Sequence, residues 1–341
     1  MASTSRKTKA VILAAGKGTR MKSDLPKVLH PLMGKPLIAW VMDACKKAGT
    51  DDALLVIGHQ ADLVRSTLGK DPTYVEQTEQ LGTGHAVMVC RDALQSFKGD
   101  LLVLAGDTPF LTGQILKRLI SRHQKSGAAA TLMTAMMDPP LSYGRIVREH
   151  GKIQRIVEAR DASPEEKKIT EVNTSHYCFQ AEKLFPCLDR LSTNNDQGEY
   201  YLTDVIQMLV GNGEDVESLT SSDPAVLMGI NSRVHLAEAN EVLGNDIKKK
   251  WMENGVTLLD PASVYIEPDV KIGRDTTLYP GTVLLGKTRI GTGCVIGPQV
   301  KLTDAGIGDR SRIEFSVIVK RKIDKDSVIG PFAFLSGDPE Y

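Results

Sequence analysis

The sequence predicts an α/β domain with a mostly parallel sheet and helices on both faces, followed by a short left-handed parallel β-helix. Three observations predict this arrangement. Apolar strand patterns alternate with amphipathic helical patterns from Lys9 to about Gly229, which is typical of βαβ units. A glycine-rich turn directly follows the first of these strands. From Ile266 onward, aliphatic residues recur every six positions, which indicates a solenoid whose rungs share one core.

The alternating region predicts its elements in chain order. Strands are expected at 10–13, 53–57, 101–104 and 128–134, and helices at 37–48, 62–68, 84–94 and 112–125. Ligands bind such sheets at the carboxyl ends of the strands. The turn after Leu13 and the Gly106-Asp107 pair should therefore share one crevice. A helix is expected over 232–252, with an apolar stripe formed by Leu236, Ala239, Val242, Leu243 and Ile247.

The six-residue register defines the second part of the chain. Aliphatic residues stand at 266, 272, 278, 284, 290, 296 and 302, and after a one-residue deletion at 307 and 313. Val317, Ile323, Ile329 and Leu335 carry a further register. A series of unrelated β-hairpins would not keep such spacing. We therefore expect a first domain at 8–231, a linker helix at 232–255 and a β-helix of hexapeptide repeats at 256–341.

The glycine-rich turn reads Leu13-Ala-Ala-Gly-Lys-Gly-Thr-Arg-Met21, and Pro26-Lys27 follows it. Gly16 and Gly18 allow positive φ and close backbone approach, so N–H groups can converge on an anion. Arg20 and Lys27 can bind phosphate oxygens. Neither a Walker loop nor a dinucleotide fingerprint fits these residues. The turn predicts a nucleotide phosphate site, and a ligand-free strand–loop–helix connection is the less favoured interpretation.

This turn and the motifs after it resemble the sugar-1-phosphate nucleotidyltransferases, and within them the bacterial N-acetylglucosamine-1-phosphate uridylyltransferases. The resemblance covers nearly the whole chain and implies a Rossmann-like nucleotidyltransferase domain. It implies transfer of UMP from UTP to N-acetylglucosamine-1-phosphate, giving pyrophosphate and UDP-N-acetylglucosamine, a peptidoglycan precursor in cell wall biogenesis. The motifs, in order, are Gln77 with Gln80-Leu-Gly-Thr-Gly-His-Ala86, Gly106-Asp107, Tyr143-Gly-Arg-Ile146, Glu158, Glu171-Val-Asn-Thr174, Gly198-Glu-Tyr-Tyr-Leu-Thr-Asp204 and Gly229-Ile-Asn-Ser232.

The resemblance also implies the site residues. Arg20, Lys27 and Asp107 are the expected catalytic residues, and Asp107 with Asn231 is expected to bind Mg²⁺. No general base is expected, because the attacking group is itself a phosphate whose second pKa is about 6. His85 is accordingly expected to pack beside the site or to support its residues, and not to act as a base. The expected substrate-binding residues are Leu13, Ala14, Ala15, Gly16, Lys27, Gln77, Gly82, Thr83, Ala105, Gly106, Asp107, Gly144, Glu158, Asn173 and Asn231.

Several of these residues have simpler interpretations when each is considered alone. Asp107, Thr83 and Asn231 could each cap a helix, and Gln77 could be an ordinary surface residue. Tyr201 and Thr203 are expected near the sugar, although Tyr201 could equally belong to the core.

Two positions depart from the family pattern and bear on the choice of sugar. Ala105 stands where tyrosine is frequent, and Ser175 stands where glycine is usual. One alternative is therefore a uridylyl- or thymidylyltransferase for another sugar-1-phosphate, such as glucose-1-phosphate. A non-catalytic, nucleotide-sugar-binding trimeric scaffold is the other. The resemblance implies a homotrimer through the β-helix. That helix is shorter than in bifunctional members, so acetyltransferase activity is not expected.

Composition argues against several classes of partner. The chain has 42 basic and 42 acidic residues, so neither nucleic acid nor an anionic membrane is expected to bind it. No apolar run is long enough to span a bilayer, and the N-terminus lacks the pattern of a signal peptide. The five cysteines are scattered without a CxxC pair, which is typical of reduced cytoplasmic proteins. A cytoplasmic enzyme with small-molecule substrates is expected.

Overall fold

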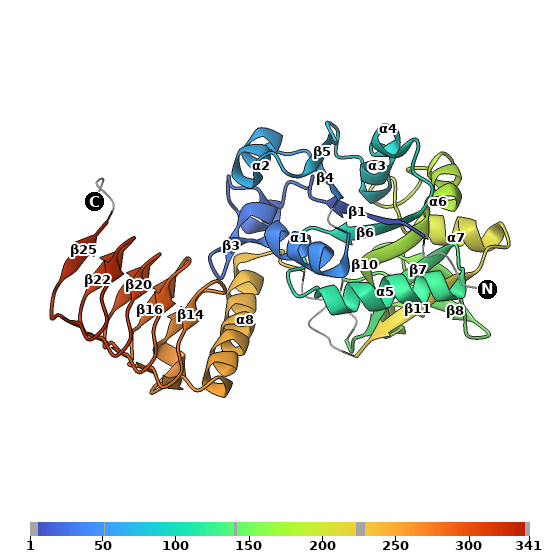
Figure 1. The fold of residues 1–341 in the computed structure, drawn as a ribbon. Helices are drawn as coiled ribbons and strands as arrows, with labels where there is room; N and C mark the ends of the chain where they lie inside the picture. Colours follow the sequence, from blue (N-terminus) through green and yellow to red (C-terminus); the bar gives the residue numbers. More distant parts are fainter. Residues whose placement is uncertain (1–5, 51, 140–141, 223–228, 338–341) are drawn as a thin grey trace. The chain divides into compact units, whose positions relative to one another are not determined.

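The structure, a computed structural model, describes residues 6–50, 52–139, 142–222 and 229–337. It consists of two compact units, one formed by residues 1–30 and 36–235 and the other by residues 31–35 and 236–341 (Figure 1). The first is an α/β unit, and the second contains the β-helix. Within the described ranges, none of the helices combines the length and the apolar character needed to cross a bilayer.

The α/β unit is built on one nine-stranded sheet. Its central order is β11-β7-β10-β6-β1-β4-β5, and β8 and β9 extend from β10. Neighbouring strands are parallel except around β10, which pairs antiparallel with β6, β7 and β8, and in the β8–β9 hairpin. The mostly parallel sheet is thus confirmed, with β10 as an exception that the alternating pattern did not predict. The strands are β1 Thr8–Leu13, β4 Ala53–Ile57, β5 Thr73–Glu76, β6 Asp100–Ala105, β7 Ala130–Met136, β8 Arg145–Glu149, β9 Lys152–Val157, β10 Glu171–Gln180 and β11 Val216–Ser221.

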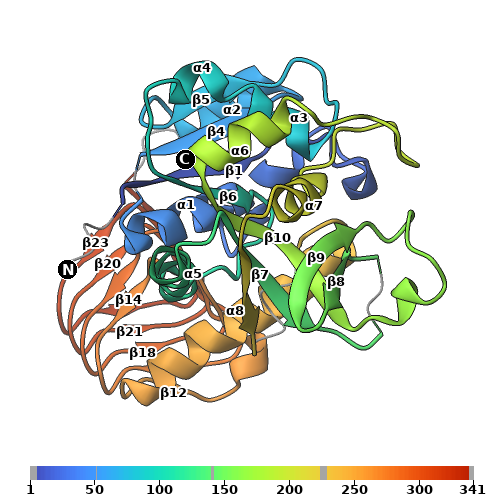
Figure 2. The ribbon, with the colours of Figure 1, turned by 90° about the vertical axis from the view of Figure 1, so that its right-hand side faces the viewer.

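Helices cover both faces of this sheet (Figure 2). Successive strand residues point to opposite faces, so Val11 and Ile12 of β1 belong to different cores. Residues of α3, α4, α6 and α7 pack in the core around Val11, and residues of α1, α2 and α5 pack in the core around Ile12. The helices are α1 Leu37–Ala48, α2 Ala61–Leu68, α3 Thr83–Met88, α4 Arg91–Leu94, α5 Gly113–Ser126, α6 Ala181–Leu188 and α7 Asp204–Gly211.

One expected helix of this unit is wrong. The single helix expected over 84–94 is divided into α3 and α4 by a turn at residues 89–90. The turn allows Leu94, which is 2% exposed, to reach the same core as Ala86 and Val87. The helices expected at 37–48, 62–68 and 112–125 match α1, α2 and α5 to within one residue at each end.

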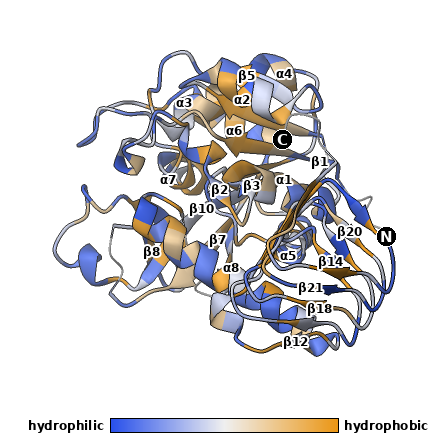
Figure 3. Cartoon of the chain, turned by 90° about the vertical axis from the view of Figure 1, so that its left-hand side faces the viewer, coloured by the Kyte–Doolittle hydropathy of each residue, from blue (hydrophilic) through white to orange (hydrophobic). Residues whose placement is uncertain are grey.

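The long helix after the α/β region is α8, Arg233–Glu253. Ser232 caps it, because its hydroxyl accepts a hydrogen bond from the N–H of His235 at 3.2 Å. Leu236 and Ala239 are buried, but Val242 is 39% exposed. At 3.6 residues per turn, Val242 lies roughly 100° around the helix from the buried face, so its assignment to the apolar stripe is wrong. Figure 3 shows α8 as largely hydrophilic with a few hydrophobic bands.

The second unit contains three parallel sheets that form a left-handed β-helix of hexapeptide repeats. Their strand orders are β12-β15-β18-β21-β24, β13-β16-β19-β22-β25 and β14-β17-β20-β23. Ile266 is in register with Leu284, and Leu284 with Leu302, so the predicted aliphatic residues stack in one core. Two further short strands, β2 Pro31–Leu32 and β3 Lys35–Pro36, pair with each other in a separate two-stranded sheet. The β-helix strands are β12 Thr257–Leu258, β13 Tyr265–Ile266, β14 Lys271–Ile272, β15 Thr277–Leu278, β16 Val283–Leu285, β17 Arg289–Ile290, β18 Val295–Ile296, β19 Lys301–Thr303, β20 Gly306–Ile307, β21 Arg312–Ile313, β22 Val317–Val319, β23 Lys322–Ile323, β24 Val328–Ile329 and β25 Phe334–Ser336.

The core residue of β22 is Ile318, whereas the hexad spacing had indicated Val317. Ile318 is fully buried and pairs with Leu302 on one side and Leu335 on the other. Val317 is in register with Lys301. A second one-residue shortening before Ile318 shifts the register, and neighbouring strand residues point to opposite faces. The assignment of Val317 to the core is therefore wrong.

Candidate active site

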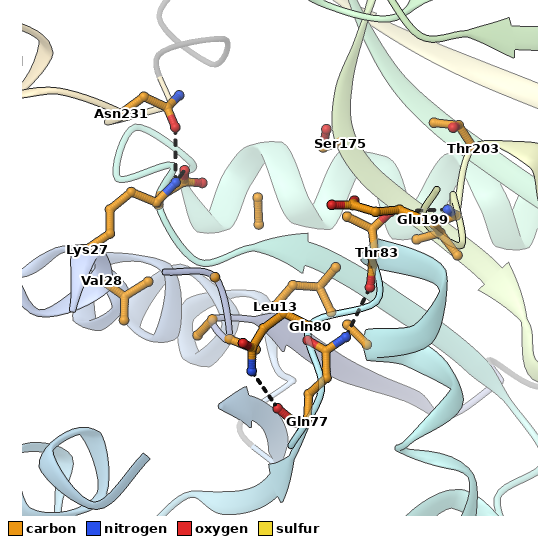
Figure 4. A pocket seen from close by; sticks show the side chains of 18 of the residues that line it. Leu13, Lys27, Val28, Gln77, Gln80, Thr83, Ser175, Glu199, Thr203 and Asn231 are labelled. Carbon is orange, nitrogen blue, oxygen red and sulfur yellow. Dashed lines mark hydrogen bonds and ion pairs between the residues drawn. The ribbon is translucent and has the colours of Figure 1, made fainter. Parts of the chain in front are cut away.

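A cavity of about 490 Å³ opens where β1 and β6 end (Figure 4). Leu13 and Ala105, the last residues of these strands, are partners in register, so the loops after them lie side by side. Pairing continues beyond the strands, because the Gly106 N–H donates to the Leu13 carbonyl at 2.9 Å. The expected crevice is therefore present. Its lining consists of Leu13, Ala14, Ala15, Gly16, Arg20, Lys27, Val28, Gln77, Gln80, Gly82, Thr83, Ala86, Ala105, Asp107, Glu158, Ser175, Tyr177, Glu199, Leu202, Thr203 and Asn231.

The cavity brings together all the predicted site residues except Gly106, Gly144 and Asn173. These three support the lining instead of contributing to it. A Cβ on Gly106 would lie 2.9 Å from the Leu13 carbonyl oxygen. The Gly144 carbonyl accepts from the Asn173 N–H at 2.8 Å. The Asn173 side chain donates through Nδ2 to the Tyr177 hydroxyl at 2.7 Å, so it is already engaged within the protein.

One end of the cavity is formed by Arg20, Lys27, Asp107 and Asn231. The Lys27 ammonium forms an ion pair with the Asp107 carboxylate and donates to Asn231 Oδ1 at 3.0 Å. Arg20 Nη2 donates to the same Oδ1 at 3.0 Å. The Ile230 N–H donates to the Asp107 carbonyl at 2.9 Å, which holds Asn231 beside Asp107. Residues from four separate segments thus meet at one point.

The two glycines of the turn have different roles. Gly18 has φ +61°, and a Cβ there would lie 2.6 Å from Lys27 Cβ, so glycine at this position lets Lys27 lie against the turn. Gly16 lies outside the set of residues with positive φ, and a Cβ there would meet nothing within 4 Å. Gly16 therefore does not use the positive φ that glycine allows, but it leaves open space beside the backbone for a close approach.

The oxygens of Asp107 and Asn231 are chemically suited to a hard divalent cation. Both contact the Lys27 ammonium, so a positive charge is already accommodated between them. Among the residues that the structure describes, no group of three or more His, Cys, Asp or Glu side chains could enclose a metal ion. A cation held by Asp107 and Asn231 would complete its coordination with phosphate oxygens and water, as Mg²⁺ commonly does beside nucleotides.

The other wall of the cavity presents the Gln77 side chain, which is 3% exposed. Its Nε2 donates to the Gly82 carbonyl at 3.1 Å and lies 3.1 Å from His85 Nδ1. Because a carbonyl can only accept, the amino group must face Gly82, and both of its hydrogens are then used within the protein. The Gln77 amide oxygen is left as an acceptor. His85 acts by orienting Gln77, in agreement with its expected supporting role.

The opposite end of the cavity contains Glu158 and Thr203. The Thr203 hydroxyl donates to Glu158 Oε1 at 3.0 Å. Burial raises the pKa of the Glu158 carboxyl above its ordinary value, although the Thr203 hydrogen bond opposes the shift. Burial likewise raises the pKa of the neighbouring Tyr177 phenol. These groups can hold the hydroxyls of a sugar in a fixed orientation.

Sequence reasoning missed part of the lining. Gln80, Ala86, Glu199 and Leu202 lie within the motifs, and Val28 directly follows the Pro26-Lys27 pair, so the motifs carried a signal for them. Tyr177 had none, since it lies between the motifs, three residues after Thr174. Thr203 lines the cavity as expected.

Tyr201 does not line the cavity. It is 6% exposed, and its hydroxyl accepts from Gln197 Nε2 at 2.9 Å. The core interpretation of Tyr201 is therefore the correct one.

Two protein families match this chain in different regions. Residues 10–207 match the MobA-like NTP transferase domain, and residues 269–304 match the bacterial transferase hexapeptide family of six repeats. The first match includes most of the cavity, and the second lies in the β-helix.

Curated relatives extend the likeness over nearly the whole chain. The chain is 48% identical to the bifunctional protein GlmU of Halalkalibacterium halodurans over 96% of this chain and 72% of that protein. It is 46% identical to the GlmU of Bacillus velezensis with the same coverage. A crystal structure from Bacillus anthracis, assigned as a glucose-1-phosphate thymidylyltransferase in complex with sucrose, has a TM-score of 0.58. It is 22% identical and covers 69% of this chain and 95% of its own, and it shows the fold alone.

Proposed function

Since the chain belongs to the family of bifunctional GlmU proteins, we infer that its cavity is the active site of a sugar-1-phosphate uridylyltransferase. The protein is a nucleotidyltransferase that forms UDP-N-acetylglucosamine and pyrophosphate from UTP and N-acetylglucosamine-1-phosphate. The observation that supports the site assignment is that a cationic group, a base-reading amide and a buried carboxylate share one cavity.

We propose that the reaction depends on alignment and charge neutralisation. The sugar phosphate attacks the α-phosphorus of UTP through an oxygen that is already ionised, since its second pKa is about 6, so no protein base has to remove a proton. Arg20 and Lys27 neutralise phosphate charge as pyrophosphate leaves. The ion pair of Lys27 with Asp107 and its hydrogen bond to Asn231 orient the ammonium for this role.

Asp107 and Asn231 are the residues that would hold Mg²⁺. Proteins of the nucleotidyltransferase class generally use a divalent metal ion. Bound Mg²⁺ would neutralise phosphate charge and fix the phosphates in one geometry. The meeting of carboxylate and amide oxygens on a shared cation supports this assignment.

Gln77 is proposed to read the nucleobase. Its free amide oxygen can accept from the N3–H of uracil, whereas cytosine presents an unprotonated N3 to the same oxygen. The Gly82 carbonyl holds the amide in this orientation, and a Cβ on Gly82 would lie 2.7 Å from the Tyr200 carbonyl oxygen. Glycine is therefore required at position 82. This arrangement favours uridine over cytidine nucleotides.

The sugar is proposed to bind at Glu158 and Thr203, with Asn173 and Gly144 supporting that end.

We further propose that the protein forms a homotrimer in the cytoplasm. Exposed aromatic residues on the β-helix, among them Phe315, Phe332 and Phe334, support a homotrimer formed through that helix. The five cysteines are all free and buried, which supports a reducing, cytoplasmic environment.

A grid of substrates tests the proposed function. Pyrophosphate release is measured with UTP, dTTP and CTP, each against N-acetylglucosamine-1-phosphate, glucosamine-1-phosphate and glucose-1-phosphate, with and without Mg²⁺. We expect the highest kcat/KM for UTP with N-acetylglucosamine-1-phosphate, and no turnover without a divalent ion. A preference for dTTP with glucose-1-phosphate would overturn the substrate assignment. Absence of turnover with every pair would favour a binding scaffold.

A further inference from the structure

Ser175 is exposed within a strand that is otherwise buried. Eight residues of β10, from Val172 to Phe179, are buried apart from Ser175. The register of β10 on β7 shifts between Asn173 and Tyr177, so Ser175 lies in a bulge. Its φ is +61°, a conformation that is unfavourable for a residue with a side chain. Such strain is retained where the surrounding structure enforces it, often at functional sites.

The residues on either side of Ser175 enforce this conformation. The Thr174 hydroxyl donates to the Met133 carbonyl at 2.8 Å, and the Ser175 N–H donates to Asn173 Oδ1 at 3.2 Å. Thr174 and His176 are 5% and 0% exposed. With both neighbours directed into the protein, the side chain of Ser175 is directed into the cavity that it lines.

Ser175 lies between the phosphate end and the sugar end of the cavity. His176 and Tyr177 directly follow Ser175 in the chain. Burial lowers the pKa of His176, and the charge of Asp107 opposes that shift. Burial raises the pKa of Tyr177, and the charge of Glu158 adds to that shift. Figure 4 shows Ser175 between Asn231 and Thr203. The position corresponds to the junction of sugar and phosphate in an acceptor that spans both ends. Gln77, which is proposed to read the nucleobase, belongs to the opposite wall.

The Ser175 hydroxyl can donate a hydrogen bond into the cavity. Asn173 Nδ2 donates to the Tyr177 hydroxyl and Asn173 Oδ1 accepts from the Ser175 N–H, so the Asn173 side chain holds the backbone of Ser175 beside Tyr177. A serine hydroxyl carries one O–H donor and two acceptor lone pairs. Because Ser175 lines the cavity, its O–H can donate to the oxygens of a sugar phosphate.

We propose that the Ser175 hydroxyl binds the acceptor sugar-1-phosphate by donating a hydrogen bond near the bond between sugar and phosphate. This inference rests on the proposed function. It assigns to Ser175 a part in acceptor binding and none in nucleotide binding.

Two substitutions separate the hydroxyl from the backbone strain. Ser175→Ala removes the hydroxyl and keeps the strain, and Ser175→Gly removes both. We expect each to raise the KM for N-acetylglucosamine-1-phosphate about tenfold, the order expected for a hydrogen bond to a charged ligand, with the KM for UTP changed less than about twofold. Ser175→Gly should melt at a higher temperature than Ser175→Ala, because only glycine adopts this φ without strain.

His150→Gly is the matched control. His150 is an exposed residue with φ +48° in the turn between β8 and β9, outside the cavity. The His150→Gly substitution should relieve backbone strain without changing the KM for UTP or for N-acetylglucosamine-1-phosphate. An active wild type whose Ser175 variants keep the KM for the sugar phosphate within twofold would overturn the inference, as would equal increases in both KM values. Inactivity of the wild type with every sugar phosphate would instead refute the proposed function.

Discussion

Replacing Asp107 with asparagine tests the centre of the proposed site. Asp107→Asn keeps the shape of the side chain and removes the charge that pairs with Lys27. The two side chains are 16% and 18% exposed, so the pair is only partly shielded from water, and its loss should cost about 1 kcal/mol of folding stability. The backbone hydrogen bond from Ile230 to the Asp107 carbonyl does not involve the side chain, so Asn231 should keep its place.

The effect on catalysis should be much larger than the effect on stability. Loss of one preorganised charged group in an active site typically lowers kcat by about 10²–10³-fold, or roughly 3–4 kcal/mol of transition-state stabilisation. We expect at least this decrease in Mg²⁺-dependent pyrophosphate release. Lys27 and Arg20 remain, so UTP binding measured by calorimetry should weaken by less than about tenfold.

Asp189→Asn is the matched control for this prediction. Asp189 forms an ion pair with Arg91 at the surface, where its side chain is 60% exposed, and loss of such a pair costs about 0.5 kcal/mol. The Asp189→Asn substitution should leave kcat and the KM values for both substrates unchanged. If Asp107→Asn retains more than about a tenth of the wild-type kcat while folding normally, the catalytic role assigned to Asp107 is refuted.

Three further perturbations test other parts of the structure. Gln77→Ala should raise the KM for UTP about tenfold and reduce the preference for UTP over CTP; steady-state kinetics with both nucleotides would contradict this if the preference were unchanged. Burial raises the pKa of Glu158 above its ordinary value of 4.5, so the stability that its protonated form contributes is lost as the pH rises above about 4.5. Glu158→Gln should therefore melt higher than wild type at about pH 7.5 and equal it near pH 4, while the KM for the sugar phosphate rises; a constant difference across this range would argue against the shift. In the β-helix, Ile318→Ala should cost about 2–5 kcal/mol and Val317→Ala less than about 1.5 kcal/mol in denaturant unfolding, and the reverse order would contradict the observed register.

Local and repeating patterns made much of the fold predictable. The alternation of apolar strands with helices and the six-residue spacing from Ile266 to Leu302 depend on which side chains face a core, and that requirement is visible in residue order. The close spacing of glycines and cations after Leu13 indicated an anion site at the end of the first strand. Phosphate binding there stays a prediction.

Tertiary structure alone decided the features that depend on distant segments. Lys27 meets Asp107 and Asn231, which are 80 and 204 positions away, because the sheet places their loops at one edge. The core position of Ile318 depends on its pairing with Leu302, since the spacing after Ile313 fits more than one register. Ser175 reaches the cavity only because a bulge turns it out of a buried strand. Burial and register are properties of neighbouring chain segments, and residue order does not specify which segments become neighbours.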